Sequence, residues 1–395
     1  MVTHDAGRRA ATSAPGRIAR PLAVWLLAAA ACAAVAGPTP PVAPQPCSPE
    51  QTLRWRGGTL RLENDLFAGT DRNYTNGVAL IGVSRDIEGA IRPECLPRPL
   101  DLYTRFIAWA DPGFWRRAAA VPASQNVVAR FGQAMYTPED KTRSDLIADD
   151  RPYAGLLYLG LAWNRRVPLP GGRLEMLDTR ELTLGVIGPA SLAEQSQDLV
   201  HRLRGIERFR GWGHQLRDEP ALQVAMERKF KRAAEGAVRA GWSHDAIGSY
   251  ALRLGNIETA ASVGVELRGG WNLPNDFGSY PVRPGAENRP PAAASALRTL
   301  QPQSALAPRP GAHVFATLEA KAVAWDFSLD GNLFRPSHRV ERRPWVAQAA
   351  AGISGQWFAA GHGLRLALMR VWRTREFSGQ RGGHAFGSIA LSVEI

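Results

Sequence analysis

The stretch AGLLYLGLAWN, residues 154–164, alternates strictly between two kinds of side chain. One face of an extended chain would carry Leu157, Leu159, Leu161 and Trp163, and the other would carry Tyr158, Gly160, Ala162 and Asn164. Alternation with a period of two is typical of a β-strand whose two faces meet different surroundings. The stretch therefore predicts a strand with one continuous apolar face.

The same alternation recurs along the chain, for example in SVGVELRG (262–269) and GSIALSVEI (387–395). Glu266 and Arg268 lie on the second face, so this face is expected to meet a polar environment. The pattern predicts strands at 58–67, 76–85, 126–137, 155–165, 180–188, 219–231, 236–247, 259–271, 313–330, 344–358, 363–376 and 384–395. Twelve is an even number, as a bacterial single-chain membrane barrel requires, although a soluble β-sandwich would also alternate.

The N-terminus indicates export. Four arginines within residues 8–20 precede the apolar run PLAVWLLAAAACAAVAG (21–37), and Ala34-Val35-Ala36 forms an A-x-A cleavage site. A basic region, a short apolar run and small residues together are typical of a signal peptide. We expect residues 1–36 to be this signal peptide and residues 37–57 to form a periplasmic tail.

Export, strand length and aromatic placement favour a membrane barrel over a sandwich. The predicted strands have roughly the length that a tilted transmembrane strand needs. Tryptophans gather near strand ends, as in the aromatic girdle of a membrane protein; these are residues 163, 242, 271, 325, 345, 357 and 372. We predict an all-β protein, a twelve-stranded antiparallel transmembrane β-barrel of the bacterial outer membrane, over residues 58–395.

The composition describes a folded, basic chain. Of its 395 residues 45% are hydrophobic and 21% charged, and the formal net charge is +12. Such a charge indicates an anionic partner. Because the arginines are scattered through loops and the strands belong to an exported chain, we expect a phosphorylated lipid as partner and no nucleic acid.

Two long inserts interrupt the strands, at 87–125 and at 272–312, and the second is rich in Pro and Ala. With both chain ends in the periplasm, connections after even-numbered strands are periplasmic, which places both inserts there. Cys95, in the first insert, then shares an oxidising compartment with Cys47 of the tail. The two are candidates for a disulfide.

Four polar stretches follow the first, third, fifth and seventh predicted strands and should open on the external side. They are residues 63–77, 136–155, 196–220 and 252–259. G-x-S-x-G, H-E-x-x-H, a Walker loop and a strand-linked G-x-G-x-x-G are all absent from the sequence. Each stretch alone is also explained by ordinary turns. What indicates a functional site is that all four are expected at the same rim of the barrel.

These stretches carry motifs that resemble one enzyme family. The motifs are ENDLFAGTDRNYTNG (63–77), DRPYAG (150–155), Q-x-x-x-H (197–201), GW-x-x-QL-x-x-EP (211–220) and LGNIET (254–259). In this order they resemble the outer-membrane lipid A 3'-O-deacylases of Gram-negative bacteria. The resemblance implies a twelve-stranded barrel that removes the 3'-linked acyloxyacyl chain from lipid A or lipopolysaccharide at the outer leaflet and depends on Ca²⁺.

The resemblance also implies which residues act. The catalytic and calcium-site positions of the family fall on Asn64, Asp65, Thr75, His201 and Glu207. Histidine can activate water for ester hydrolysis, and a carboxylate with amide and hydroxyl oxygens suits Ca²⁺. We therefore expect Asp65, Asn64 and Thr75 to bind the metal, which would polarise the acyl carbonyl.

A basic residue of the family falls on the loop 136–155. Lys141 matches best and Arg143 is the alternative, and either would bind a lipid phosphate.

The sequence thus predicts a calcium-dependent carboxylic ester hydrolase in the cell outer membrane, with its active site facing the external leaflet. Two alternatives remain open: a non-enzymatic pore or adhesion barrel, and a barrel phospholipase. The oligomeric state and the role of the 87–125 insert are also open.

Overall fold

The computed structural model describes Cys47 and residues 52–65, 73–88, 92–119, 124–233, 238–279 and 309–395. The chain divides into two compact units, residues 1–46 and 47–395. The predicted signal peptide and most of the predicted tail lie outside the described residues.

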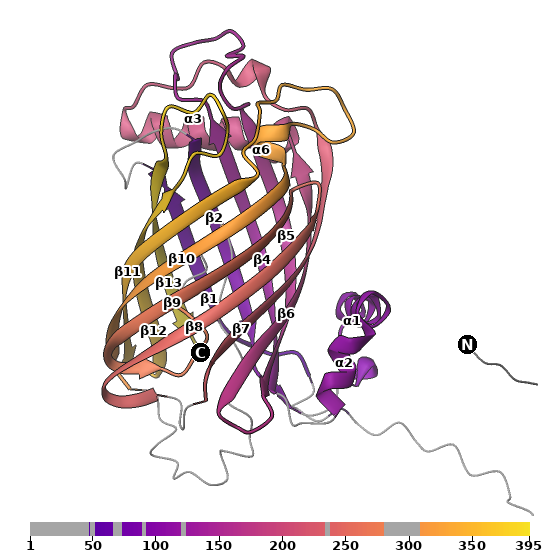
Figure 1. The fold of residues 1–395 in the computed structure, drawn as a ribbon, viewed down its shortest axis with the longest axis vertical. Helices are drawn as coiled ribbons and strands as arrows, with labels where there is room; N and C mark the ends of the chain where they lie inside the picture. Colours follow the sequence, from indigo (N-terminus) through magenta and orange to yellow (C-terminus); the bar gives the residue numbers. More distant parts are fainter. Residues whose placement is uncertain are drawn as a thin grey trace, which may run out of the picture. The chain divides into compact units, whose positions relative to one another are not determined.

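Twelve long antiparallel strands form a closed barrel (Figure 1). They are β1 (Trp55–Asn64), β2 (Asn73–Ser84), β4 (Ser124–Thr137), β5 (Ala154–Pro168), β6 (Leu174–Ile187), β7 (Glu219–Arg232), β8 (Val238–Gly255), β9 (Glu258–Pro274), β10 (Gly311–Asp326), β11 (Trp345–Ala359), β12 (His362–Arg373) and β13 (His384–Glu394). A two-residue strand, β3 (Ile87–Glu88), pairs with β4. Because β13 pairs with β1 and β2 with β4, the barrel is closed, and the predicted fold class is confirmed.

The two faces of the wall are inverted relative to a soluble protein. In β1 the polar side chains of Thr59, Arg61 and Glu63 are buried in the lumen, whereas Leu60 and Leu62 are exposed on the outside. Exposed leucines continue around the barrel, and buried ion pairs fill its interior. A wall that presents leucine outward and buries charge inward is built to stand in lipid.

Short helices occupy the connections. The β2–β4 connection contains η2 (Pro93–Cys95), α1 (Arg98–Ala110) and α2 (Pro112–Ala119). The β6–β7 connection contains η3 (Pro189–Ser191), α3 (Ala193–Arg204) and η4 (Trp212–His214), and α6 (Phe327–Asp330) follows β10. Figure 1 shows α3 and α6 at one end of the barrel and α1 and α2 towards the other. None of the helices in the described ranges is long and apolar enough to cross a membrane.

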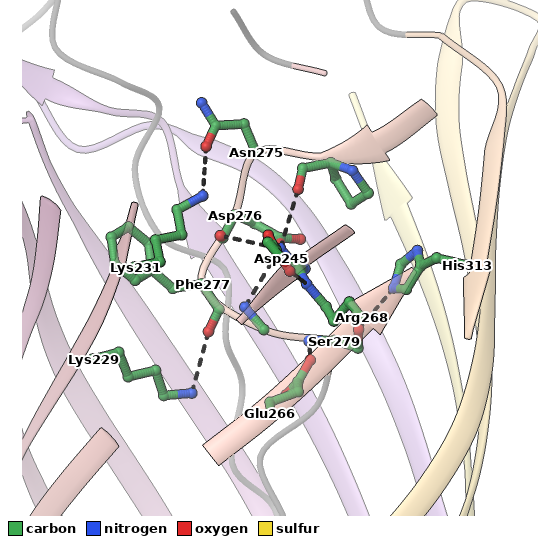
Figure 2. A network of polar contacts seen from close by, with 12 residues as sticks. Lys229, Lys231, Asp245, Glu266, Arg268, Asn275, Asp276, Phe277, Ser279 and His313 are labelled. Carbon is green, nitrogen blue, oxygen red and sulfur yellow. Dashed lines mark hydrogen bonds and ion pairs between the residues drawn. The ribbon is translucent and has the colours of Figure 1, made fainter. Parts of the chain in front are cut away.

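A short segment after β9, residues 275–279, is largely buried and lies among polar side chains of the barrel interior (Figure 2). Arg268 forms ion pairs with Asp245, at 2.6 Å, and with Asp276. Lys231 Nζ donates to Asn275 Oδ1 at 2.5 Å, and the Ser279 amide donates to Glu266 at 2.8 Å. These contacts join the segment, here called the plug, directly to β7 and β9, and Arg268 links it to Asp245 of β8.

Several predicted boundaries were wrong. The strand predicted at 236–247 extends to Gly255, so the polar stretch 252–259 is mainly strand and its turn is only Asn256 and Ile257. The strand predicted at 180–188 begins earlier, at Leu174, and residues 327–330 form α6. Charged residues within β6 and β8 explain the two strand errors, because a strand that carries charge resembles a loop in sequence. The α6 error has a different cause, since Asp326 caps this helix by accepting from the Ser328 amide.

The helical insert changes one part of the predicted aromatic girdle. Trp242, Trp271, Trp345, Trp357 and Trp372 are exposed near strand ends, in line with the prediction. Trp163 is fully buried instead, because it packs with Ile107 and Phe114 of the insert.

Cys47 and Cys95 form a disulfide with a Cα–Cα distance of 5.6 Å. The bond ties the residues ahead of β1 to this same insert.

Candidate functional site

Helix α3 lies against the outer wall of the barrel rather than over its mouth. A Cβ added to Gly155 of β5 would lie 2.1 Å from Ser191 Oγ and 2.5 Å from Ala193 Cβ, so only glycine permits this approach. The amide of Gln133, on the outer face of β4, donates to the Ser191 carbonyl at 2.6 Å. The start of α3 is therefore anchored to two neighbouring strands.

The face of α3 that meets the wall carries Ala193, Gln197 and His201, all buried. Their spacing of four residues places them on one side of a helix. Leu199 and Leu203 lie on the other side and are 51% and 79% exposed. The helix thus holds two polar side chains against the barrel and presents leucines to the surroundings.

His201 is oriented by a main-chain contact with Glu207. Gly205 ends α3 in the left-handed conformation (φ 66°), and the chain turns back so that the Glu207 carbonyl oxygen lies 2.7 Å from His201 Nδ1. A carbonyl oxygen only accepts, so Nδ1 must carry the proton, which leaves Nε2 as the basic atom. The Glu207 carboxylate itself is half-exposed and pairs with Arg210 at 3.2 Å.

Gln197 is a second buried polar group beside His201, and the sequence analysis did not include it among the site residues. Its Oε1 accepts from the indole N–H of Trp212 at 2.7 Å, which identifies the other amide atom as nitrogen. In the described part of the chain this nitrogen has no hydrogen-bond partner. The Q-x-x-x-H spacing, one helical turn, was the available sequence signal.

Oxygen atoms gather where β1 and β2 approach their turn. Asn64 pairs in register with Asn76, on the same outer face as the exposed leucines of the two strands. Thr75 is the extra residue of a β-bulge between Tyr74 and Asn76, and its hydroxyl lies 2.6 Å from that of Thr137 in β4. Because Tyr74 points into the lumen, the bulge turns two consecutive residues outward.

Asp65 directly follows β1 and is fully buried. Chain order and strand pairing therefore place the three predicted residues Asn64, Asp65 and Thr75 at the same end of β1 and β2, with Asn76 and Thr137, which were not predicted, beside Thr75.

A continuous set of contacts links this rim to His201. Met135 lies on β4 two residues from Thr137 and packs with Tyr153, Phe209 and Trp212. The ring of Phe209 lies 5.7 Å from the ring of His201. Burial raises the pKa of the Tyr153 phenol to about 12, so this wall of the site stays uncharged at neutral pH. The oxygen-rich rim and the histidine thus border one region of the outer wall.

The chemistry of the rim fits a hard cation such as Ca²⁺, because every candidate donor is oxygen and one is a carboxylate. Among the described residues no three His, Cys, Asp or Glu side chains come together as a metal cluster. A cation held here would therefore rely on Asp65 together with amide, hydroxyl and main-chain oxygens.

The predicted basic residues lie in the β4–β5 loop. The Lys141 carbonyl accepts from the Arg210 amide at 3.0 Å, which joins this loop to the turn that carries Glu207. Lys141 and Arg143 line a cavity of about 450 Å³ between this loop and the β12–β13 loop. Arg143 donates to Asp145, and this hydrogen bond lowers the pKa of the Asp145 carboxyl to about 2.

Comparison with known proteins places the chain in a family. The family model described as "Outer membrane protein LpxR" matches residues 22–395. The chain belongs to the LpxR family. The family predicted from the motifs is therefore confirmed, and with it the location in the outer membrane.

A solved structure of the same family shares the fold. LpxR from Salmonella typhimurium is 17% identical, with a TM-score of 0.57, and the match covers 85% of this chain and 99% of that one. The β-domain of the Bordetella autotransporter BrkA is 8% identical, with a TM-score of 0.41 over 86% of this chain and 98% of the other, too low to carry an argument. No curated protein matches the chain.

Proposed function

We propose that this LpxR-family protein is a calcium-dependent esterase that removes the 3'-linked acyloxyacyl chain of lipid A at the outer leaflet. Family membership supports an outer-membrane enzyme that modifies lipid A. The observation that carries the proposal is the placement of His201: a buried histidine with Nδ1 bonded to a carbonyl, on the lipid-facing side of the wall. A base in this position acts on a substrate that lies in the membrane.

The proposed reaction needs a base, a donor for the oxyanion and a leaving-group acid. His201 Nε2 takes a proton from water, and the oxygen of that water attacks the ester carbonyl carbon. The Gln197 amide N–H donates to the oxyanion that forms. When the intermediate collapses, the sugar oxygen leaves and recovers the proton from His201, so the products are a free acyloxyacyl acid and a sugar hydroxyl.

Ca²⁺, bound by Asp65 with Asn64 and Thr75, would polarise the ester carbonyl. The remaining roles belong to the chain. The Glu207 carbonyl keeps the His201 ring in one tautomer, and Lys141 or Arg143 binds a phosphate of the headgroup. The exposed Leu199 and Leu203 support this arrangement, since they give acyl chains an apolar surface on the opposite face of the helix that carries the histidine.

The test is expression of the chain in a Gram-negative host, followed by mass spectrometry of its lipid A with added Ca²⁺ or with a chelator. We expect the loss of one acyloxyacyl unit only in the presence of Ca²⁺. His201→Ala is the control, because it removes the base and leaves the barrel residues in place. Unchanged lipid A although the wild-type barrel is folded in the outer membrane, or release of ordinary glycerophospholipid fatty acids, would contradict the proposal.

A further inference from the structure

The helical insert between β2 and β4 is docked on the outside of the barrel. Phe114 of α2 is fully buried between two guanidinium groups, those of Arg165 and Arg180, which lie 4.9 Å and 4.7 Å from its ring centre. The Tyr103 hydroxyl of α1 donates to the Arg180 carbonyl at 2.8 Å. Arg165 and Arg180 face away from the lumen, so the insert shields charge on a wall that otherwise presents leucine. The insert is a fixed part of the barrel surface.

Helix α1 has two opposite faces. Leu100, Tyr103, Thr104 and Ile107 are buried against the wall. Arg98, Leu102, Arg105 and Trp109, here called the outer stripe, follow one another at spacings of four, three and four residues and so share a single line along the helix. Leu102 is 66% and Trp109 81% exposed, so the outer stripe points away from the barrel.

The height of α1 on the wall places the outer stripe beside the lipid-facing belt. The helix packs on Trp163 of β5 and bonds to Arg180 of β6, two residues that pair in register. Leu159 and Leu184 lie on the same outer face, each four positions further along its strand. They pair with each other and are 62% and 52% exposed. Leu161 and Leu182 lie between the two levels, partly buried against the insert. Successive outward residues of a strand are about 7 Å apart. The part of the wall that the insert covers therefore ends about 7 Å from the exposed Leu159 and Leu184.

The composition of the outer stripe suits the boundary between acyl chains and headgroups. Tryptophan concentrates at this boundary, and arginine can bury its stem while its guanidinium reaches phosphate. Arg105 pairs with Asp101 at 3.1 Å in an exposed geometry, where headgroup phosphates compete readily. Two large apolar side chains on a stripe are too few for the core of a stable protein interface.

We propose that the outer stripe of α1 binds the glycerophospholipid leaflet at the end of the barrel away from α3, with Leu102 and Trp109 inserted among acyl chains and Arg98 and Arg105 bound to anionic headgroups. This surface is separate from the catalytic site, and the proposal does not rest on the esterase activity. It makes the insert a second membrane anchor that fixes the depth and tilt of the barrel.

The test measures where Leu102 lies in a membrane. Full-length protein carrying Leu102→Cys in a Cys32→Ala background is spin-labelled and reconstituted in phosphatidylethanolamine vesicles with and without phosphatidylglycerol. Collision rates with O₂, which concentrates in lipid, and with a water-soluble nickel chelate report depth. Leu159→Cys, on the apolar belt, is the lipid control, and Arg173→Cys, in the exposed β5–β6 turn, is the water control.

We expect the Leu102 label to give an O₂-to-nickel ratio close to that of the Leu159 label and several-fold above that of the Arg173 label. The ratio should rise when anionic lipid is added, and Arg98→Gln with Arg105→Gln should abolish this rise. A Leu102 ratio equal to the Arg173 ratio would mean that the stripe faces water and would overturn the proposal. Low collision with both reagents would mean that protein covers the stripe and would overturn it equally.

Discussion

The Nδ1 atom of His201 and the carbonyl oxygen of Glu207 lie 2.7 Å apart, and this contact leaves Nε2 as the basic atom of the ring. We predict that His201→Asn and His201→Ala both lose activity by about 10²–10⁴-fold, the usual contribution of a general base. An asparagine amide can replace the Nδ1 donor but not the base at Nε2. Lipid A deacylation by purified variants measures the effect. An active His201→Asn enzyme would mean that the ring positions substrate only.

Gln197 offers a test of oxyanion stabilisation. In Gln197→Glu one side-chain oxygen can still accept from Trp212, but the N–H donor is replaced by a second, negatively charged oxygen. We expect kcat to fall by about 10²–10³-fold, as when one oxyanion donor is removed, with a much smaller change in KM. Steady-state kinetics separate the two. A rise in KM with kcat unchanged would reassign Gln197 to substrate binding.

Asp65 is the carboxylate of the proposed calcium site. We predict that Asp65→Asn weakens Ca²⁺ binding strongly, because the amide supplies an oxygen without the charge. Both calorimetric titration with Ca²⁺ and the calcium dependence of deacylation should report the loss. Asn76→Ala, on the same rim but outside the predicted ligand set, is the comparison. Full activity of Asp65→Asn in the presence of chelator would argue against a metal at this rim.

Arg151, from the DRPYAG motif, is a structural residue according to its contacts. It is fully buried and pairs with Glu376 at 2.9 Å, while Arg373 pairs with the same carboxylate at 2.9 Å. We expect Arg151→Ala to lower the free energy of unfolding, but by less than the roughly 3–5 kcal/mol that a buried charge left without a partner costs, because Arg373 still pairs with Glu376. Arg151→Lys should lose less. Denaturant unfolding in detergent measures both, and equal stability of the two variants would count against this reading.

The plug, residues 275–279, allows a test between an enzyme and a pore, because a pore would need an open lumen. We predict that the wild-type protein gives no steady conductance in planar bilayers and that Arg268→Ala produces open events, since Asp245 and Asp276 lose their shared cation. Arg228→Ala removes an ion pair with Asp178 on the outer wall and should stay closed. Steady conductance of the wild type would favour a pore.

The barrel wall was predictable from sequence because each strand carries its environment in alternate residues, as AGLLYLGLAWN does. Its interruptions were not. Trp163 lies near a strand end, as a girdle residue would, but helices of the insert cover it. This contact is long-range, so the residues around Trp163 do not predict it. Charged residues such as Arg253 and Glu258 looked like loop polarity, although they form an ion pair at 3.0 Å beside a short turn.

The site was partly predictable for a related reason. His201 and Asp65 are identified by motif order, which the chain preserves through a large insert. Asn76 and Thr137 were not selected, because their proximity to Thr75 depends on strand pairing and a bulge. The role of the Glu207 main chain is likewise invisible in a sequence, where only the carboxylate appears.

The bulge at Thr75 has a consequence for how this site can change. The one extra residue reverses which side chains of β2 face outward on the far side of the bulge. A substitution at the rim changes one side chain, but loss or gain of a single residue between Tyr74 and Asn76 would exchange inward-facing for outward-facing side chains. The oxygen-rich rim thus depends on the number of residues in this part of β2 as much as on their side chains. A homologue with a residue more or fewer here would not place the same oxygen atoms on the outer face.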